Sequence, residues 1–158
     1  MNLSILVVGQ ARAGKSCYIG RVVTGQFCPR VSGTCDLHTN IGTISLSFSE
    51  SLVPSEGYDG YIFMYDHARP ETSDMVLRAS SCTVVVASKC DGRVTAPDHP
   101  SGIPSFSVSA KWNKNLTDPI LHIVRSHLGN VYLTDTTISP PLVRLPRTTI
   151  SQIVRSLF

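Results

Sequence analysis

The sequence of 158 residues predicts an α/β fold with a mostly parallel sheet. Short, continuous apolar runs occur at Leu3 to Val8, Tyr61 to Tyr65 and Thr83 to Ala87, and such runs are typical of buried parallel strands. Apolar residues recur at helical spacing in Lys15 to Val23 and in Leu116 to Leu128. Because strands and helices alternate along the chain, we expect a layered α/β sandwich.

A single core is expected because this length is ordinary for one domain. Apolar residues make up 42% of the chain and charged residues 16%, with a mean hydropathy of +0.09, which excludes a disordered chain. No run approaches the roughly 18 uncharged apolar residues that span a bilayer. We assign residues 1–128 to the globular domain and residues 129–158 to a C-terminal tail.

The segment after the first helix is expected to hold a loop and a hairpin. Gly25 is a plausible end for the helix, because glycine commonly follows a last helical turn. Residues 26–34 are predicted to form an exposed loop. Residues 35–49 alternate polar and apolar side chains around Asn40-Ile41-Gly42, which predicts a hairpin with one buried face.

The second half of the chain is less regular. A short helix is expected near Glu71–Ala79 and a weaker strand at Ile103 to Val108. The proline-rich start of the tail is expected to be extended or to wrap along the surface. Residues 148–158 place apolar side chains on one side of a short amphipathic helix, which either covers the domain's own core or docks on a partner or a membrane.

Charge and cysteine usage narrow the class of protein. The net charge is +3 and the isoelectric point about 8.7, with basic residues far apart, so we expect no nucleic-acid partner. The cysteines are odd in number and lack a C-x-x-C spacing, which indicates a reducing, cytoplasmic location. No cysteine follows Cys90, so a C-terminal prenyl anchor is not expected.

The sharpest motif is Gly9-Gln-Ala-Arg-Ala-Gly14-Lys15-Ser16, which fits G-x-x-x-x-G-K-[ST]. It follows a predicted strand and opens a predicted helix, where backbone N–H groups and the helix N-terminus can surround phosphate oxygens. Lys15 is expected to reach the β- and γ-phosphates, and the Ser16 hydroxyl to bind Mg²⁺.

Two further motifs follow predicted strands and indicate the base. Ser88-Lys89-Cys90-Asp91 comes after the run ending at Ala87, and Ser109-Ala110-Lys111 comes after Val108. A carboxylate can accept from two adjacent N–H groups on one edge of guanine, which adenine does not offer. We therefore expect Asp91 to read guanine.

With these motifs, residues 3–128 resemble the Ras superfamily of small GTPases, and the Rab branch most closely. The resemblance implies a P-loop NTPase domain with a Ras-like three-layer sandwich, here compacted, that binds GTP or GDP with Mg²⁺. Ser16 and Thr34 are the implied metal ligands, and Phe27 is implied to pack on the guanine. The implied nucleotide-binding residues are Gly9, Ala11, Arg12, Ala13, Gly14, Lys15, Ser16, Cys17, Phe27, Thr34, Ser88, Lys89, Asp91, Ser109, Ala110 and Lys111.

The chain departs from the family in its second switch. The family has Asp-x-x-Gly, a catalytic Gln and a helix after its third strand, whereas here Ser49 to Gly57 leads within a few residues to the run at Tyr61. No catalytic residue is identified. Glu50 or Glu56 is a candidate replacement for the Asp near Mg²⁺, and Gly57 for the glycine. Ala11 also narrows the space for an attacking water and an arginine finger.

These features lead to three hypotheses. In the first, the protein binds guanine nucleotide, hydrolyses GTP slowly or not at all, and acts by binding protein partners of small-GTPase pathways such as vesicle trafficking. In the second, it is an active GTPase switch completed by a partner protein. In the third, it is a scaffold with the fold and no nucleotide.

Overall fold

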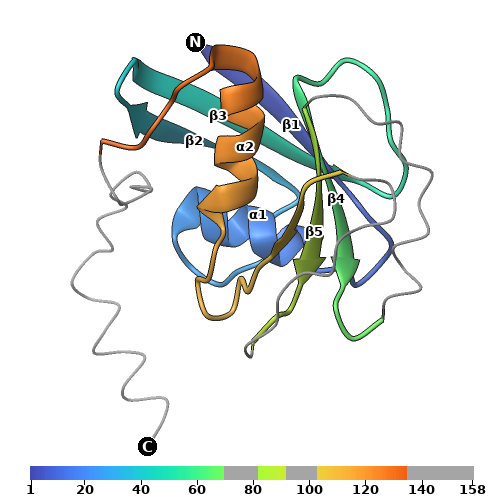
Figure 1. The fold of residues 1–158 in the computed structure, drawn as a ribbon. Helices are drawn as coiled ribbons and strands as arrows, with labels where there is room; N and C mark the ends of the chain where they lie inside the picture. The colour runs from blue at the N-terminus through green and yellow to red at the C-terminus, as the bar shows by residue number, and fades with distance from the viewer. Residues whose placement is uncertain (70–81, 92–102, 135–158) are drawn as a thin grey trace, which may run out of the picture.

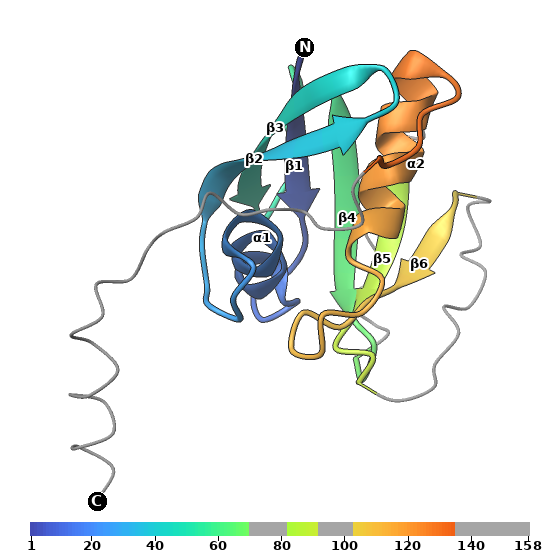
Figure 2. The same cartoon turned by 90° about the vertical axis from the view of Figure 1, so that its left-hand side faces the viewer.

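The computed structural model describes residues 1–69, 82–91 and 103–134, which form an α/β unit with a six-stranded sheet and two helices. The strands lie in the order β2-β3-β1-β4-β5-β6, with β2 at one edge and β6 at the other (Figure 2). Every neighbouring pair is parallel except β2 and β3. The elements are β1 (Asn2–Val8), α1 (Lys15–Thr24), β2 (Ser32–Thr39), β3 (Gly42–Ser51), β4 (Gly60–Asp66), β5 (Thr83–Ser88), β6 (Ser105–Ser107) and α2 (Thr117–Leu128).

The apolar runs form the central strands because both faces of the sheet are covered. Alternate side chains of β1 enter two different core clusters: Ile5 and Val7 in one, Leu6 and Val8 in the other. A strand buried on both faces requires apolar residues at every position, which is the pattern that predicted it. The predicted α/β class and its mostly parallel sheet are confirmed.

Both described helices cover the same face of the sheet (Figure 1). Their apolar sides, represented by Ile19 of α1 and Ile123 of α2, pack with Ile5 and Val7 in the larger cluster. Helix α1 ends as predicted at Gly25, whose φ of 73° allows its N–H to bond the Arg21 carbonyl. The helix expected near Glu71–Ala79 lies outside the described residues, so the third layer of the sandwich stays a prediction.

The predicted hairpin is present, but it is longer than expected. Strands β2 and β3 pair antiparallel from Ser32–Ser49 to Thr39–Gly42, with buried side chains on one face. The prediction of a loop over residues 26–34 is wrong for its last three residues, which belong to β2. Ser32 and Gly33 have weak strand propensity, and the ladder to β3 decides their conformation.

The first residues of the predicted tail pack on the domain. Val131 is buried in the larger core cluster, and Leu133 forms an antiparallel bridge with Thr39 at the outer edge of β2. The Asn40 and Thr134 N–H groups donate to the Tyr132 and His38 carbonyls at 3.1 Å each. Residues 135–158, including the predicted amphipathic helix, lie outside the described residues.

The connection between β3 and β4 is short and contains no helix. Residues 52–59 run directly from one strand to the other, with exposed side chains from Leu52 to Gly57. Asp59 at its end is anchored, because its carboxylate accepts from the Ser4 N–H at 2.8 Å and the Ser4 hydroxyl at 3.0 Å. The predicted loss of the helix after the third strand is confirmed.

Neither α1 nor α2 has the length and hydropathy that a bilayer-crossing helix needs, a finding that covers the described ranges alone. All five cysteines are free thiols.

Candidate functional site

The loop between β1 and α1 lies at the carboxyl edge of the sheet. The five parallel strands lie in the order β3-β1-β4-β5-β6. The chain passes from β1 to β3 on one side of β1 and then to β4 on its other side, so the order of the strands reverses between β1 and β4. Ligands of open α/β sheets bind outside the strand ends at such a point. A cleft of about 560 Å³ opens there. Its lining residues are Ala11, Arg12, Ala13, Gly14, Lys15, Ser16, Cys17, Glu50, Ser51, Leu52 and Lys89.

The loop is packed tightly against the neighbouring strand ends. A Cβ on Gly9 would lie 2.4 Å from the Met64 carbonyl oxygen in β4, so only glycine fits there without a backbone shift. Gly14 precedes α1 with φ 90°, a left-handed conformation that favours glycine. The first and sixth residues of the motif are therefore required by this loop's geometry.

Lys15 turns back into the loop. Its ammonium donates to the Gly9 carbonyl at 2.7 Å and to the Gln10 carbonyl at 2.8 Å, and the residue is only 7% exposed. Burial lowers the pKa of Lys15, an effect that the nearby Glu50 carboxylate opposes. The loop therefore holds a confined cation at the base of the cleft.

Ser16 and Glu50 meet across the cleft. The Ser16 hydroxyl donates to Glu50 Oε2 at 2.6 Å, which joins the first turn of α1 to the end of β3. A hydroxyl and a carboxylate are the hard oxygen ligands that Mg²⁺ prefers. Of the two candidate replacements for the family's Asp, Glu50 lies in the site, whereas Glu56 lies in the exposed loop and does not line the cleft. Gly57 does not line the cleft either.

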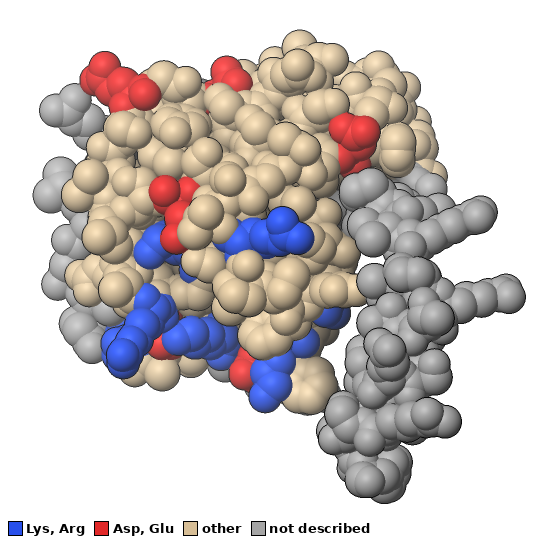
Figure 3. All heavy atoms as spheres, turned by 180° about the vertical axis from the view of Figure 1, so that it is seen from behind, with Lys and Arg blue, Asp and Glu red and all other residues tan. Residues whose placement is uncertain are grey.

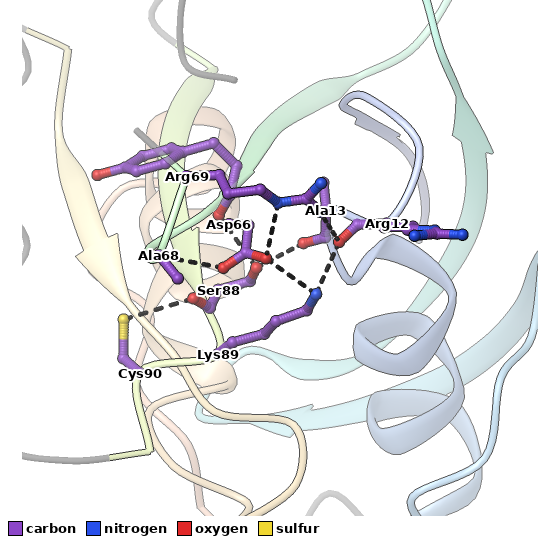
Figure 4. A network of polar contacts seen from close by, with 9 residues as sticks. Arg12, Ala13, Asp66, Ala68, Arg69, Ser88, Lys89 and Cys90 are labelled. Atoms are coloured by element: carbon purple, nitrogen blue, oxygen red, sulfur yellow. Dashed lines mark hydrogen bonds and ion pairs between the residues drawn. The ribbon is translucent and has the colours of Figure 1, made fainter. Parts of the chain in front are cut away.

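Asp66, at the end of β4, is the centre of a polar network that includes Lys89, a residue lining the cleft (Figure 4). It is 5% exposed, and its Oδ2 accepts from Lys89 Nζ at 3.0 Å and from Arg69 Nε at 3.4 Å. Burial alone would raise the pKa of Asp66, but the hydrogen bonds from Lys89, the Ala68 N–H and Arg69 outweigh it and hold the pKa below its ordinary value. Asp66 is therefore an anion that fixes Lys89 beside the loop.

Ser88 and Lys89 tie the end of β5 to the loop. The Ser88 hydroxyl lies within hydrogen-bonding distance of two carbonyls, those of Ala13 and Tyr65, and has one proton to donate. Lys89 Nζ donates to the Arg12 carbonyl at 2.8 Å. The motif at the end of β5 thus contacts the β1–α1 loop through the side chains of Ser88 and Lys89.

The expected guanine reader is held in place by the second motif. Asp91 Oδ1 accepts from the Ser109 hydroxyl at 2.6 Å, and Ser109 itself is fully buried. The Trp112 N–H donates to the Ser109 oxygen at 3.2 Å, which leaves the hydroxyl proton for Asp91. Ala110 is partly buried, and Lys111 lies exposed with its ammonium 5.4 Å from the centre of the Trp112 ring. Asp91, Ser109 and Ala110 thus form one group where β5 and β6 end.

Eight of the residues that the resemblance implies are not among those lining the cleft: Gly9, Phe27, Thr34, Ser88, Asp91, Ser109, Ala110 and Lys111. Phe27 is 52% exposed on the loop after α1. Thr34 lies in β2, paired with Ser47, and its side chain is exposed on the face opposite the buried Cys35. The structure therefore brings together the β1–α1 loop, Glu50 and Lys89, whereas Phe27, Thr34 and the group formed by Asp91 and Ser109 lie outside the cleft lining.

The charge distribution suits an anionic ligand. Lys and Arg side chains gather toward the end of the molecule at which β4 and β5 terminate, with carboxylates among them (Figures 1 and 3). Such a concentration of positive charge beside a cleft attracts anions more strongly than the modest net charge suggests.

No protein-family model matches this sequence, and a search of curated proteins finds no significant match. The candidate site therefore stands on its motifs and its geometry.

Asp66 was missed as a functional residue in the sequence. The available signal was its position, because a carboxylate directly after the apolar run at Tyr61 to Tyr65 falls at the carboxyl edge of a parallel sheet. Its partners could not be predicted from spacing, since Arg69 is local but Lys89 is distant along the chain.

Proposed function

We propose that the protein is a guanine-nucleotide-binding protein with a compacted, Ras-like P-loop fold that binds GTP or GDP with Mg²⁺. The observation that carries the proposal is the confined Lys15 cation in a glycine-bounded loop at the junction of β1 and β4. The loop's backbone and the α1 N-terminus supply donors for phosphate oxygens. The group formed by Asp91 and Ser109 supports guanine as the base.

Ser16 and Glu50 are the residues that would hold Mg²⁺. Their oxygens lie 2.6 Å apart at the mouth of the loop, which fits a small, hard cation that keeps several waters. The ion supplies charge neutralisation of the phosphates when bound. Thr34 is the second ligand that the resemblance implies, and it would have to approach from β2.

Hydrolysis of GTP is proposed to be slow or absent. Residues 52–59 contain no Gln and no helix that could orient an attacking water. The protein would then act by binding partners of small-GTPase pathways, and its GTP-bound state would not be ended by its own hydrolysis of GTP. A partner that supplies the missing groups would instead make it an active switch.

Equilibrium binding to the nucleotide-free protein tests the proposal. GDP and GTP are titrated in the presence of Mg²⁺, with excess ATP as competitor, for the wild type and for Asp91→Asn. We expect binding that excess ATP does not displace from the wild type, and weaker GDP and GTP binding in the variant, because an amide accepts at one oxygen only. A folded wild type that binds neither nucleotide would leave only the scaffold hypothesis.

Glu50→Gln is expected to weaken the effect of the metal rather than the binding of the base. In the wild type, Mg²⁺ should strengthen GDP binding. The ratio of the GDP affinities with and without Mg²⁺ should be roughly tenfold smaller in the variant, because a neutral amide is a poorer ligand than a carboxylate. The measurement is GDP affinity with Mg²⁺ and with EDTA, together with direct Mn²⁺ binding by electron paramagnetic resonance. Glu56→Gln is the matched control, and equal Mn²⁺ binding by both variants would exclude Glu50 as a ligand.

A further inference from the structure

Arg12 has a backbone conformation that favours glycine. Arg12 lies in the phosphate loop with φ 64°, in the left-handed region that non-glycine residues adopt at a cost. It also lines the cleft. A long cationic side chain at a strained backbone position beside a cleft is a candidate for a role in binding.

The backbone of Arg12 is fixed from the side of β4 and β5. Its carbonyl accepts from Lys89 Nζ at 2.8 Å and from Arg69 Nη2 at 3.3 Å, and both cations also contact Asp66. These contacts involve the backbone of Arg12 alone and leave its side chain uninvolved. Figure 4 shows the Arg12 guanidinium pointing away from Asp66 and Lys89.

The Arg12 guanidinium is the uncommitted cation among those that line the cleft. The Lys15 ammonium donates to two loop carbonyls, and Lys89 is paired with Asp66. Within residues 1–69, 82–91 and 103–134, Arg12 has no side-chain hydrogen bond or ion pair. An exposed guanidinium presents several N–H donors in a planar fork that matches two oxygens of a phosphate.

We propose that the Arg12 guanidinium binds the polyphosphate of the nucleotide, as a second cation beside Lys15. The inference rests on the proposed function and adds a side-chain ligand where the motif requires only backbone. Asp66 holds Lys89 and Arg69, which in turn hold the backbone carbonyl of Arg12. Arg12 itself is the residue of the loop with the left-handed backbone conformation.

Two variants separate this contact from the backbone strain. Arg12→Gln keeps a long side chain at the left-handed position and removes the charge, whereas Arg12→Gly removes both the charge and the strain. Arg21→Gln, on α1 and outside the cleft lining, controls for the lost net charge. GDP and GTP affinities are measured by calorimetry at low and high ionic strength, with denaturant unfolding of the nucleotide-free proteins.

We expect both Arg12 variants to bind GDP and GTP on the order of tenfold more weakly than the wild type and Arg21→Gln, because one charge-assisted contact is lost. Their affinities should also fall less steeply with salt. Arg12→Gly should unfold at the same denaturant concentration as the wild type or a higher one. Its nucleotide affinity would thus fall without any loss of stability. Variants that bind as the wild type does would overturn this inference alone, whereas a wild type that binds no nucleotide would overturn the proposed function together with it.

Discussion

Lys15→Met is expected to weaken GDP binding by at least about 100-fold, or about 3 kcal/mol, because charge-assisted contacts to phosphate are lost in a confined site. Methionine keeps the length of the stem and removes the ammonium. The ammonium is buried and held between the Gly9 and Gln10 carbonyls, so no other cation can take its place at the base of the cleft. The measurement is calorimetric titration of the nucleotide-free variant with GDP and Mg²⁺.

The same substitution should leave the fold intact. Burial already disfavours the charged form of Lys15, as its lowered pKa indicates, so removing the charge also removes a desolvation cost. The unfolding midpoint of the variant should therefore stay close to that of the wild type. Arg21→Met removes one cation from the same helix outside the cleft lining and should bind GDP normally. Equal losses in the two variants would show that net charge, not Lys15, accounts for the affinity.

Gly20→Ala is expected to lower the free energy of unfolding by about 3 kcal/mol, near the upper end for overpacking a tight contact. A Cβ at Gly20 would lie 1.6 Å from the Cys28 carbonyl oxygen and 3.3 Å from the Arg30 nitrogen. Both neighbours are backbone, so the chain after α1 would have to move as a unit. The Arg30 N–H, which donates to the Ser16 carbonyl at 3.0 Å, would move with it and disturb the first turn of α1 at Ser16.

Gly57→Ala is the matched control for this prediction. A Cβ there would meet nothing within 4 Å, and its φ of 99° leaves only backbone strain of about 1 to 2 kcal/mol. Denaturant unfolding of both variants measures the difference. If Gly20→Ala were no less stable than Gly57→Ala, the close packing of residues 28–30 on α1 would be wrong.

Local sequence determined the elements of the fold and the glycine-bounded loop between β1 and α1. The runs at Leu3 to Val8 and Thr83 to Ala87 could be predicted as strands because burial on both faces requires apolar residues at every position. The loop from Gly9 to Ser16 could be predicted because its glycines and its lysine act within a few residues of one another. The missing helix before Tyr61 was equally visible, since too few residues separate the two strands.

Only the tertiary structure decided which distant side chains share the site. The pairing of β3 with β1 brings Glu50, rather than Glu56, to Ser16, and the pairing of β5 with β4 brings Lys89 to Asp66. It likewise places Thr34, which the resemblance implies as a metal ligand, in β2 with its side chain exposed. Spacing along a chain fixes contacts within a turn or a helix, whereas contacts between strand ends depend on the order and register of the sheet, which long-range burial sets.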